Sequence, residues 1–176
     1  MDKSLTNNEE ISIWFDSYEE LFSDFDPRSY SKRTLSNDFV EQIKKVAKDI
    51  HTKNVTLKLL ILDNNRNKPD EEIIAQRLHS FFKHNYEQLF EEKKNAKLKG
   101  VTATIVGVLS MVISSYITFL KSEEYLLHLL QILFEPAGWF LLWMGLDYLI
   151  YFSTNTKTDL EFYAKMTNVT IEFGTY

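Results

Sequence analysis

Residues 101–120, VTATIVGVLSMVISSYITFL, form a hydrophobic stretch of 20 residues without a charge. At about 1.5 Å of rise per residue, a helix of this length covers roughly 30 Å, the hydrocarbon thickness of a bilayer. A buried helix of a soluble protein usually carries a polar stripe, whereas this segment offers only serine and threonine. The pattern therefore predicts a first membrane-spanning helix.

A second hydrophobic stretch, residues 125–152, follows the short polar connection KSEE. Pro136 interrupts it, and proline suits the first turn of a helix, where its missing N–H needs no partner. We therefore expect the core of a second span at residues 136–152. Residues 125–134 are expected to lie at the outer interface as an apolar lead-in, or to continue the helix with a kink.

Small side chains recur in the first span at helical spacing and form one ridge along it. The ridge comprises Ala103, Gly107, Ser110, Ser114 and Thr118. Small residues let two membrane helices approach closely. The ridge is therefore predicted to pack against another helix, either inside the hairpin or between copies in a homo-oligomer.

Asp147 is the one acid within residues 138–152, GWFLLWMGLDYLIYF. It lies five residues before the end of the predicted second span, roughly 8 Å along a helix from the cytoplasmic interface, where Lys97 and Lys99 are also expected. One interpretation is that Asp147 is hydrated or paired with a lysine at this shallow depth. The other is that it lines an aqueous path through an oligomer, as a pore residue.

Upstream of the spans, the hydrophobic pattern alternates between strand and helix periods. Residues 11–15 (ISIWF) and 55–62 (VTLKLLIL) are typical of strands, and the second is apolar enough to be covered on both faces. Between them, residues 36–50 have apolar side chains at helical spacing after Ser36, a preferred N-cap residue. Strand, helix and strand in this order predict a parallel βαβ unit.

The same domain is predicted to include segments on both sides of the hairpin. A second amphipathic helix is expected from Pro69 into the first span, and residues 169–173 (VTIEF) indicate a final strand in the same sheet, since a lone strand leaves its backbone unpaired. The predicted fold is a small cytosolic α/β domain with a three-stranded sheet, followed by a two-helix transmembrane hairpin. Its segments are the α/β domain at 1–98, the hairpin at 99–153 and a C-terminal segment at 154–176.

Charge is divided unevenly along the chain and predicts an orientation. Residues 1–100 contain 17 Lys/Arg and 18 Asp/Glu, whereas residues 101–176 contain 3 and 7. Neither part is a basic surface, so we expect no nucleic-acid partner. Lys93, Lys94, Lys97 and Lys99 precede the first span, while the connection between the spans has only Lys121. The positive-inside rule then predicts a plasma (inner) membrane protein with both termini in the cytoplasm.

The sequence contains no motif that indicates a cofactor, a metal or a catalytic nucleophile. The five glycines are scattered rather than gathered in a phosphate-binding loop, and the absence of cysteine excludes thiolate chemistry. His79 and His84 are five residues apart, which is not the spacing of two zinc ligands on one helix face. We therefore expect a non-enzymatic protein without a cofactor.

One group of polar residues is a candidate ligand or partner site. Ligands of parallel sheets tend to bind beyond the carboxyl ends of the strands, and here those ends lead into two polar loops, residues 16–33 and 63–70. The candidate residues are Asp16, Ser17, Asp24, Asp26, Arg28, Asp63, Arg66 and Lys68. The alternative is that these mixed charges are ordinary solvated surface.

Three segments together resemble a family of small, uncharacterised bacterial two-span membrane proteins with an N-terminal α/β domain. They are YEELFSDFDPRSYSKRTLSNDF at 18–39, the pair Trp139 and Trp143 with Asp147, and the ending FYAKMTNVTIEF at 162–173. The resemblance covers most of the chain. It implies the same architecture and no particular activity.

Three classes of function agree with this pattern. The first is a non-enzymatic module whose cytosolic domain binds a protein partner or a small signal and is anchored in the bilayer by an oligomerising hairpin. The second is a membrane-permeabilising effector of a bacterial antiviral or toxin system. The third is a membrane-bound hydrolase that uses the acids at the sheet edge, although no compact catalytic set is evident.

Overall fold

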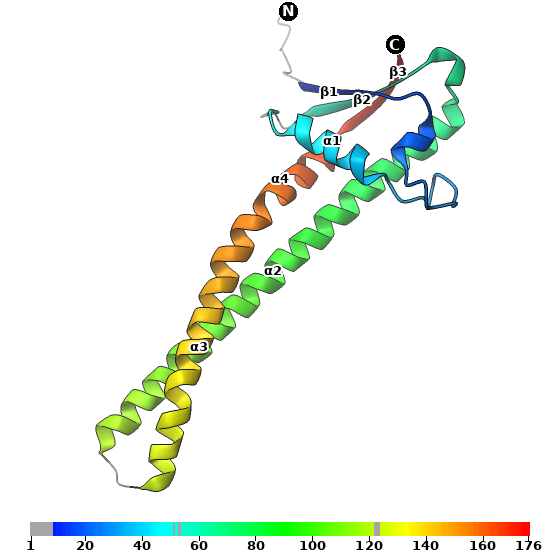
Figure 1. Ribbon diagram of the computed structural model, residues 1–176. Coiled ribbons are helices and arrows are strands. Elements are labelled where there is room, and N and C mark those ends of the chain that lie inside the picture. Colours follow the sequence, from blue (N-terminus) through cyan, green and yellow to red (C-terminus); the bar gives the residue numbers. More distant parts are fainter. Residues whose placement is uncertain (1–8, 51, 53, 122–123) are drawn as a thin grey trace, which may run out of the picture. The chain divides into compact units, whose positions relative to one another are not determined.

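The computed structural model describes residues 9–50, 52, 54–121 and 124–176 (Figure 1). In chain order the elements are β1 (Glu9–Trp14), the short 3-10 helix η1 (Tyr18–Leu21), α1 (Asn37–Ala47), β2 (Val55–Ile61), the 3-10 helix η2 (Asp63–Asn65), α2 (Lys68–Leu120), α3 (Tyr125–Asn155), α4 (Lys157–Met166) and β3 (Thr170–Thr175). They form two compact units. The α/β unit comprises Met1–Glu87 and Asp159–Tyr176, and the hairpin unit comprises Gln88–Thr158.

The three strands form one sheet in the order β1-β2-β3, and both neighbouring pairs are parallel. Leu57 of β2 is opposite Ile11 on one side and Ile171 on the other. The predicted parallel βαβ unit is therefore present. The prediction that the C-terminal strand joins the same sheet is also confirmed.

The sheet buries mainly one face, which corrects the expectation that β2 is covered on both. Val55, Leu57, Leu59 and Ile61 are buried, whereas the alternate residues of β2 are only half-buried. One of these, Lys58, forms an ion pair with Glu10 of β1 at 3.4 Å. Polar side chains at alternate positions keep this second face partly open to solvent.

Helices supply the rest of the core of the α/β unit. The buried stripe of α1 consists of Phe39, Val40, Ile43 and Ala47, and Figure 1 shows this helix against one side of the sheet. The first turns of α2 bury Ile74, Leu78 and Phe82, which recur every four residues along one face. Phe82 meets Phe162 of α4 edge to face, with 6.3 Å between ring centroids. The segments before and after the hairpin unit therefore share one core.

Two helices are long and apolar enough to cross a membrane: α2, and α3 over Tyr125–Tyr151. As predicted, the second amphipathic helix continues into the first apolar run, because α2 extends unbroken from Lys68 to Leu120. Of the two alternatives expected for residues 125–134, the structure shows the continued helix, since α3 already begins at Tyr125. Pro136 lies inside this helix and cannot donate a hydrogen bond to the carbonyl of Ile132, a loss that membrane helices often tolerate.

Two pairs of glycines bring the helices of the hairpin unit into close contact. A Cβ added to Gly107 would lie 2.7 Å from the backbone nitrogen of Leu142 and 2.9 Å from the carbonyl oxygen of Gly138. A Cβ added to Gly145 would lie 2.7 Å from the nitrogen of Thr104 and 2.8 Å from the carbonyl oxygen of Gly100. Gly107 is therefore opposite Gly138 and Gly100 opposite Gly145, seven residues apart on each helix.

The first prediction concerns this close packing. Gly107→Leu is expected to destabilise the hairpin by about 2–3 kcal/mol, because the new side chain meets backbone atoms that cannot move aside. Thermal unfolding of the full chain in detergent, followed by circular dichroism, measures the effect. Val108→Leu, at an exposed neighbouring position, is the matched control and should change little. Equal unfolding temperatures for the two variants would contradict the glycine contacts.

Candidate functional site

Glu71 is the centre of a buried polar network in the α/β unit. Glu71 lies in the first turn of α2 and is 7% exposed. The Arg66 guanidinium donates two hydrogen bonds to its carboxylate, both of 2.9 Å, and the Tyr18 hydroxyl donates a third of 2.9 Å. Arg66 also donates to the carbonyl of Phe173 at 3.3 Å, and the backbone N–H of Asn67 donates to the Tyr18 hydroxyl at 3.1 Å. The network joins η1, α2 and β3.

The same contacts shift the pKa values of the network. Hydrogen bonds from Arg66 hold the pKa of Glu71 below its ordinary value despite the opposing effect of burial, and the bond from Tyr18 acts in the same direction. Burial raises the pKa of the Tyr18 hydroxyl. A buried carboxylate whose charged form is stabilised by a guanidinium is typical of a structural ion pair. Arg66, a predicted site residue, therefore has a structural role here.

Asp16 lies where the carboxyl ends of the strands meet, as the sequence predicts. Its backbone carbonyl accepts a hydrogen bond of 2.9 Å from the side-chain amide of Asn65, and its carboxylate accepts one of 2.9 Å from the hydroxyl of Tyr176. The ring of Tyr176 also contacts Trp14 edge to face at 6.0 Å. These contacts link the loops that follow β1 and β2 to the end of β3.

The other predicted residues near this edge differ in their surroundings. Ser17 is the N-cap of η1: its hydroxyl accepts from the N–H of Glu19, while the carboxylate of Glu20 accepts from the N–H of Ser17. This capping box fixes the turn that follows β1. Asp63 begins η2 and Lys68 begins α2, and both are exposed.

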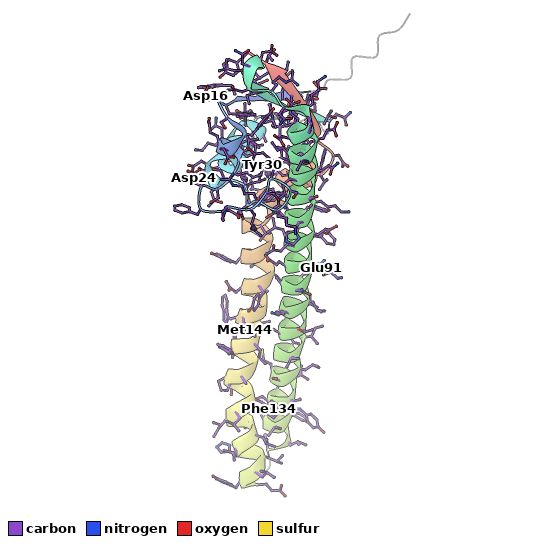
Figure 2. The ribbon with its side chains drawn as sticks, turned by 90° about the vertical axis from the view of Figure 1, so that its right-hand side faces the viewer. Asp16, Asp24, Tyr30, Glu91, Phe134 and Met144 are labelled. Atoms are coloured by element: carbon purple, nitrogen blue, oxygen red, sulfur yellow. The ribbon has the colours of Figure 1, made fainter. Side chains whose placement is uncertain are left out.

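Asp24, Asp26 and Arg28 belong to a separate loop between Phe22 and Leu35. Figure 2 shows Asp16 and Asp24 on different parts of the α/β unit. The Arg28 guanidinium donates two hydrogen bonds to the Asp26 carboxylate, of 2.8 and 2.7 Å, and the backbone N–H of Thr34 donates another of 2.7 Å. The bonds from Arg28, followed by that from Thr34, hold the pKa of Asp26 far below its usual range. Asp26 and Arg28 therefore close this loop on itself.

The loop is also fastened to the domain beneath it. Arg77 of α2 donates to the carbonyl of Arg33 at 2.9 Å, and Arg33 forms an ion pair with Glu19. Tyr30 stacks on Phe22 with 5.2 Å between ring centroids and donates to Glu19 at 2.8 Å. Burial, followed by the bond to Glu19, raises the pKa of Tyr30 to about 12. The loop therefore has a defined conformation that presents Asp24 to solvent.

Two adjoining hollows lie beside this loop, with volumes of about 410 and 340 Å³. Asp24 and Asp38 line both of them, over a floor that includes Phe22. The larger hollow also contains Glu19 and Glu20 and follows the last residues of β1, which is an edge strand. We call this surface the acidic groove. It is concave and negatively charged, and it is bordered by the last residues of β1, which is an edge strand of the sheet among the residues that the structure describes.

Exposed aromatic side chains border the acidic groove. Phe25, which lines the smaller hollow, is 97% exposed, and Trp14, which lines the larger one, is 68% exposed. The sequence prediction included Asp24 but missed Trp14, Phe25 and Asp38. The available signals were an aromatic residue at the tip of a polar loop and an acid in the first turn of the helix that follows.

The predicted small-residue ridge lies inside the hairpin unit rather than on its surface. Ala103, Gly107, Ser110 and Ser114 are buried, while Thr118 is exposed. Asp147 is exposed, and the glycine register places it level with Leu98, between Lys97 and Lys99. The register therefore brings Asp147 to the level of the two lysines, while its depth in a bilayer stays a prediction. No hydrogen bond or ion pair of Asp147 is formed with the residues that the structure describes.

A further hollow, of about 360 Å³, lies on the hairpin unit and has a largely polar lining. Its lining consists of Met111, Ser114, Ser115, Thr118, Gln131, Glu135 and Trp139. We call it the Glu135 groove. The sequence analysis missed Glu135, because it began the second span one residue later, at Pro136.

Comparisons of the chain with protein-family models, with curated proteins and with solved structures found no match. Within the described residues, no group of three or more His, Cys, Asp or Glu side chains is arranged to hold a metal ion. The candidate sites are therefore defined by geometry and charge alone: the acidic groove and the Glu135 groove.

The second prediction concerns the buried network. Glu71→Gln is expected to lower the free energy of unfolding of the α/β unit by about 2 kcal/mol at pH 7, because Arg66 loses its charged partner. The folded-state pKa of Glu71 is depressed, so its contribution is complete above about pH 4.3 and is lost as the pH falls through the folded-state value. The variant should therefore lose less stability on acidification than the wild type does.

Hydrogen exchange of the β2 amides, corrected for the intrinsic effect of pH, measures both quantities in the full chain. Glu72→Gln removes the same charge from an exposed neighbour and should change stability by less than about 0.5 kcal/mol. A Glu71→Gln protein as stable as the wild type at pH 7 would contradict a stabilising network.

Proposed function

We propose that this chain is a non-enzymatic integral membrane protein whose cytosolic α/β domain binds a partner protein. The hairpin is the anchor, and the acidic groove is the binding surface. The observation on which this proposal mainly rests is the combination, in one surface, of exposed acids, exposed aromatic rings and the unpaired side of β1. The occupant that fits this surface is a basic, extended peptide segment.

The apolar exterior of the hairpin unit supports a membrane location. In the most apolar windows of α2 and α3, only 17% and 11% of the residues are buried. Exposed side chains of this surface include Ile105, Leu109, Val112 and Phe140. Such a continuous apolar surface requires cover, and lipid hydrocarbon is the cover that its length and composition suit.

The sheet supports a location of both chain ends on one side of the bilayer. β1 and β2 precede the two apolar helices, and β3 follows them, yet all three strands are hydrogen-bonded in one sheet. The chain must therefore cross the bilayer an even number of times between β2 and β3. The lysines at 93–99 favour the cytoplasm as the side on which the sheet lies.

The acidic groove favours a partner of basic and extended character. Asp24 and Asp38 are exposed and lie between the two hollows, so they attract positive charge. An added strand can pair with the free edge of β1 through backbone hydrogen bonds, while Trp14 and Phe25 offer apolar contact. Two of the predicted acids already accept hydrogen bonds, Asp16 from Tyr176 at the sheet edge and Asp26 from Thr34 and Arg28 in its own loop, which favours structural roles over hydrolysis.

The third prediction concerns topology. A fluorescent reporter that folds only in the cytoplasm should be fluorescent when fused after Tyr176, and the protein should remain in membranes washed with sodium carbonate. A reporter inserted at the connection between α2 and α3 should be dark. Fluorescence from the connection, or release of the protein by the wash, would contradict the two-span arrangement.

The fourth prediction concerns the acidic groove. An alternating Lys–Val octapeptide is expected to bind the full chain in lipid nanodiscs, with an affinity that falls as salt rises. Asp24→Lys combined with Asp38→Lys should weaken binding at least tenfold, as measured by fluorescence anisotropy of the labelled peptide.

The control variant combines Glu41→Lys, on α1, with Asp49→Lys, just beyond the end of α1. Both residues are exposed and lie outside the groove lining, and the change in net charge is the same. This control should bind within about twofold of the wild type. Equal loss of affinity in both double variants would indicate attraction by net charge alone and would contradict a defined groove.

A second candidate function is a membrane-permeabilising assembly, and the Glu135 groove is the observation that favours it. Two helices cannot enclose a water path, so conduction requires several copies with polar residues facing a common axis. Release of an encapsulated dye from liposomes that contain the full chain tests this candidate. Release that depends on the octapeptide would join the two functions, with the cytosolic domain as a sensor.

A further inference from the structure

Glu135 lies at the level of the middle of the hairpin's first apolar run. Gly107 is opposite Gly138, so the same antiparallel register places Glu135 level with Ser110. Ser110 is halfway along the uncharged stretch 101–120. If that stretch spans the bilayer, as the proposed function states, Glu135 is at the depth where a carboxylate is least stable. An acid at this depth is, by default, functional.

No basic side chain of the same hairpin is close to this level. The nearest lysines to Ser110 in the sequence are Lys99 of α2 and Lys121 just beyond its end, each eleven residues away. This separation is about 16 Å along a helix, which is beyond the reach of a lysine side chain. His128 of α3 is two turns from Glu135. To remain ionised at this depth, the Glu135 carboxylate needs a positive partner from elsewhere.

The groove around Glu135 offers oxygen atoms for such a partner. Gln131 precedes Glu135 by one helical turn, and Ser114, Ser115 and Thr118 face them from α2. The Thr118 hydroxyl donates its proton to the carbonyl of Ser114 at 2.9 Å, so its oxygen can still accept. Carboxylate, amide and hydroxyl oxygens are the ligands preferred by hard cations such as Ca²⁺ and K⁺.

The groove is open on the outside of the hairpin, so one chain supplies only part of a coordination shell. The small-residue ridge is already used between α2 and α3, and a second copy of the hairpin must therefore approach by another face. Copies that meet along the groove would bring two or more Glu135 carboxylates together. A cation between them removes the repulsion that would otherwise separate them.

We propose that the Glu135 groove is a binding site for a hard cation within the membrane, completed by a second copy of the chain. The inference rests on the proposed membrane location and adds a ligand class to it. It also transfers the role that sequence analysis considered for Asp147 to a different acid. Asp147 is level with lysines, whereas Glu135 has none nearby.

Cation-dependent thermal stability of the full chain in detergent tests the site, with CaCl₂ and KCl titrated separately to identify the ion. One of the two salts should raise the unfolding temperature of the hairpin with a saturable dependence, beyond the effect of choline chloride at equal ionic strength. Glu135→Gln should weaken this response at least tenfold, and Glu135→Asp should weaken it less. Asp147→Asn removes the same charge from the same helix and should respond within twofold of the wild type.

Light scattering on the same samples should give a complex of at least two chains when the effective cation is present. A purely monomeric protein with a full cation response would contradict completion by a second copy. If Glu135→Gln protein cannot be recovered folded, Gln131→Leu replaces it and should weaken the response at least threefold, with no weakening contradicting the site.

Two outcomes separate this inference from the proposed function. A wild-type protein that stays in carbonate-washed membranes but responds to neither salt would overturn the cation site alone. A wild-type protein that the wash releases would overturn the membrane location, and with it the argument for Glu135. An equal loss of response in Asp147→Asn and Glu135→Gln would also reject the assignment to Glu135.

Discussion

The pairing of β2 with β3 is the constraint on which the rest of the structure depends. Parallel neighbours require a crossover that returns the chain to the same end of the sheet. Here that crossover contains residues 62–169, including both long apolar helices. Because β2 and β3 are hydrogen-bonded in one sheet, a bilayer that α2 crosses must be crossed again by α3 in the opposite direction. A single crossing of the bilayer would leave β2 and β3 on opposite sides and would separate the two strands.

The same constraint limits how the two units can influence each other. Only two connections leave the α/β unit, and they differ in kind: α2 continues without a break from Lys68 to Leu120, whereas α3 ends at Asn155 and α4 begins at Lys157. The Glu71 network ties the first turn of α2 to η1 and to β3. The lining of the acidic groove comes from β1, η1 and α1, which share a core with that first turn. Of the two connections, the unbroken helix α2 is the one whose first turn the buried network holds.

Hydrophobic periodicity was enough to predict the strands, the parallel sheet and the long second helix, because each depends on local pattern or on the need to pair a backbone. It overestimated the cover of β2, where Thr56 and Lys58 keep one face partly open. It placed the core of the second span from Pro136 onward, because proline suits the first turn of a helix, whereas Pro136 lies inside α3. The predicted site residues therefore included Asp147 but not Glu135, which lies one residue before the expected start.

The candidate site at the sheet edge was predictable only in outline. Parallel topology brings Asp16, Asn65 and Tyr176 together, as the rule on strand ends implies. The sequence does not indicate which polar residues stabilise the fold through hydrogen bonds of their own, as Arg66 and Ser17 do. The acidic groove depends on how a loop folds over Phe22 and Tyr30, a tertiary contact without a local signal.

Cross-linking of β2 to β3 in native membranes tests the central claim most directly. Lys58 is opposite Glu172 in the parallel register, and the chain has no cysteine of its own, so Lys58→Cys with Glu172→Cys introduces a single pair. The account predicts that mild oxidation forms an intramolecular disulfide. It also predicts that, before oxidation, a membrane-impermeant maleimide added to intact cells reacts with neither thiol. Failure of the pair to cross-link, or reaction of both thiols from outside, would contradict a cytosolic sheet closed across a membrane hairpin.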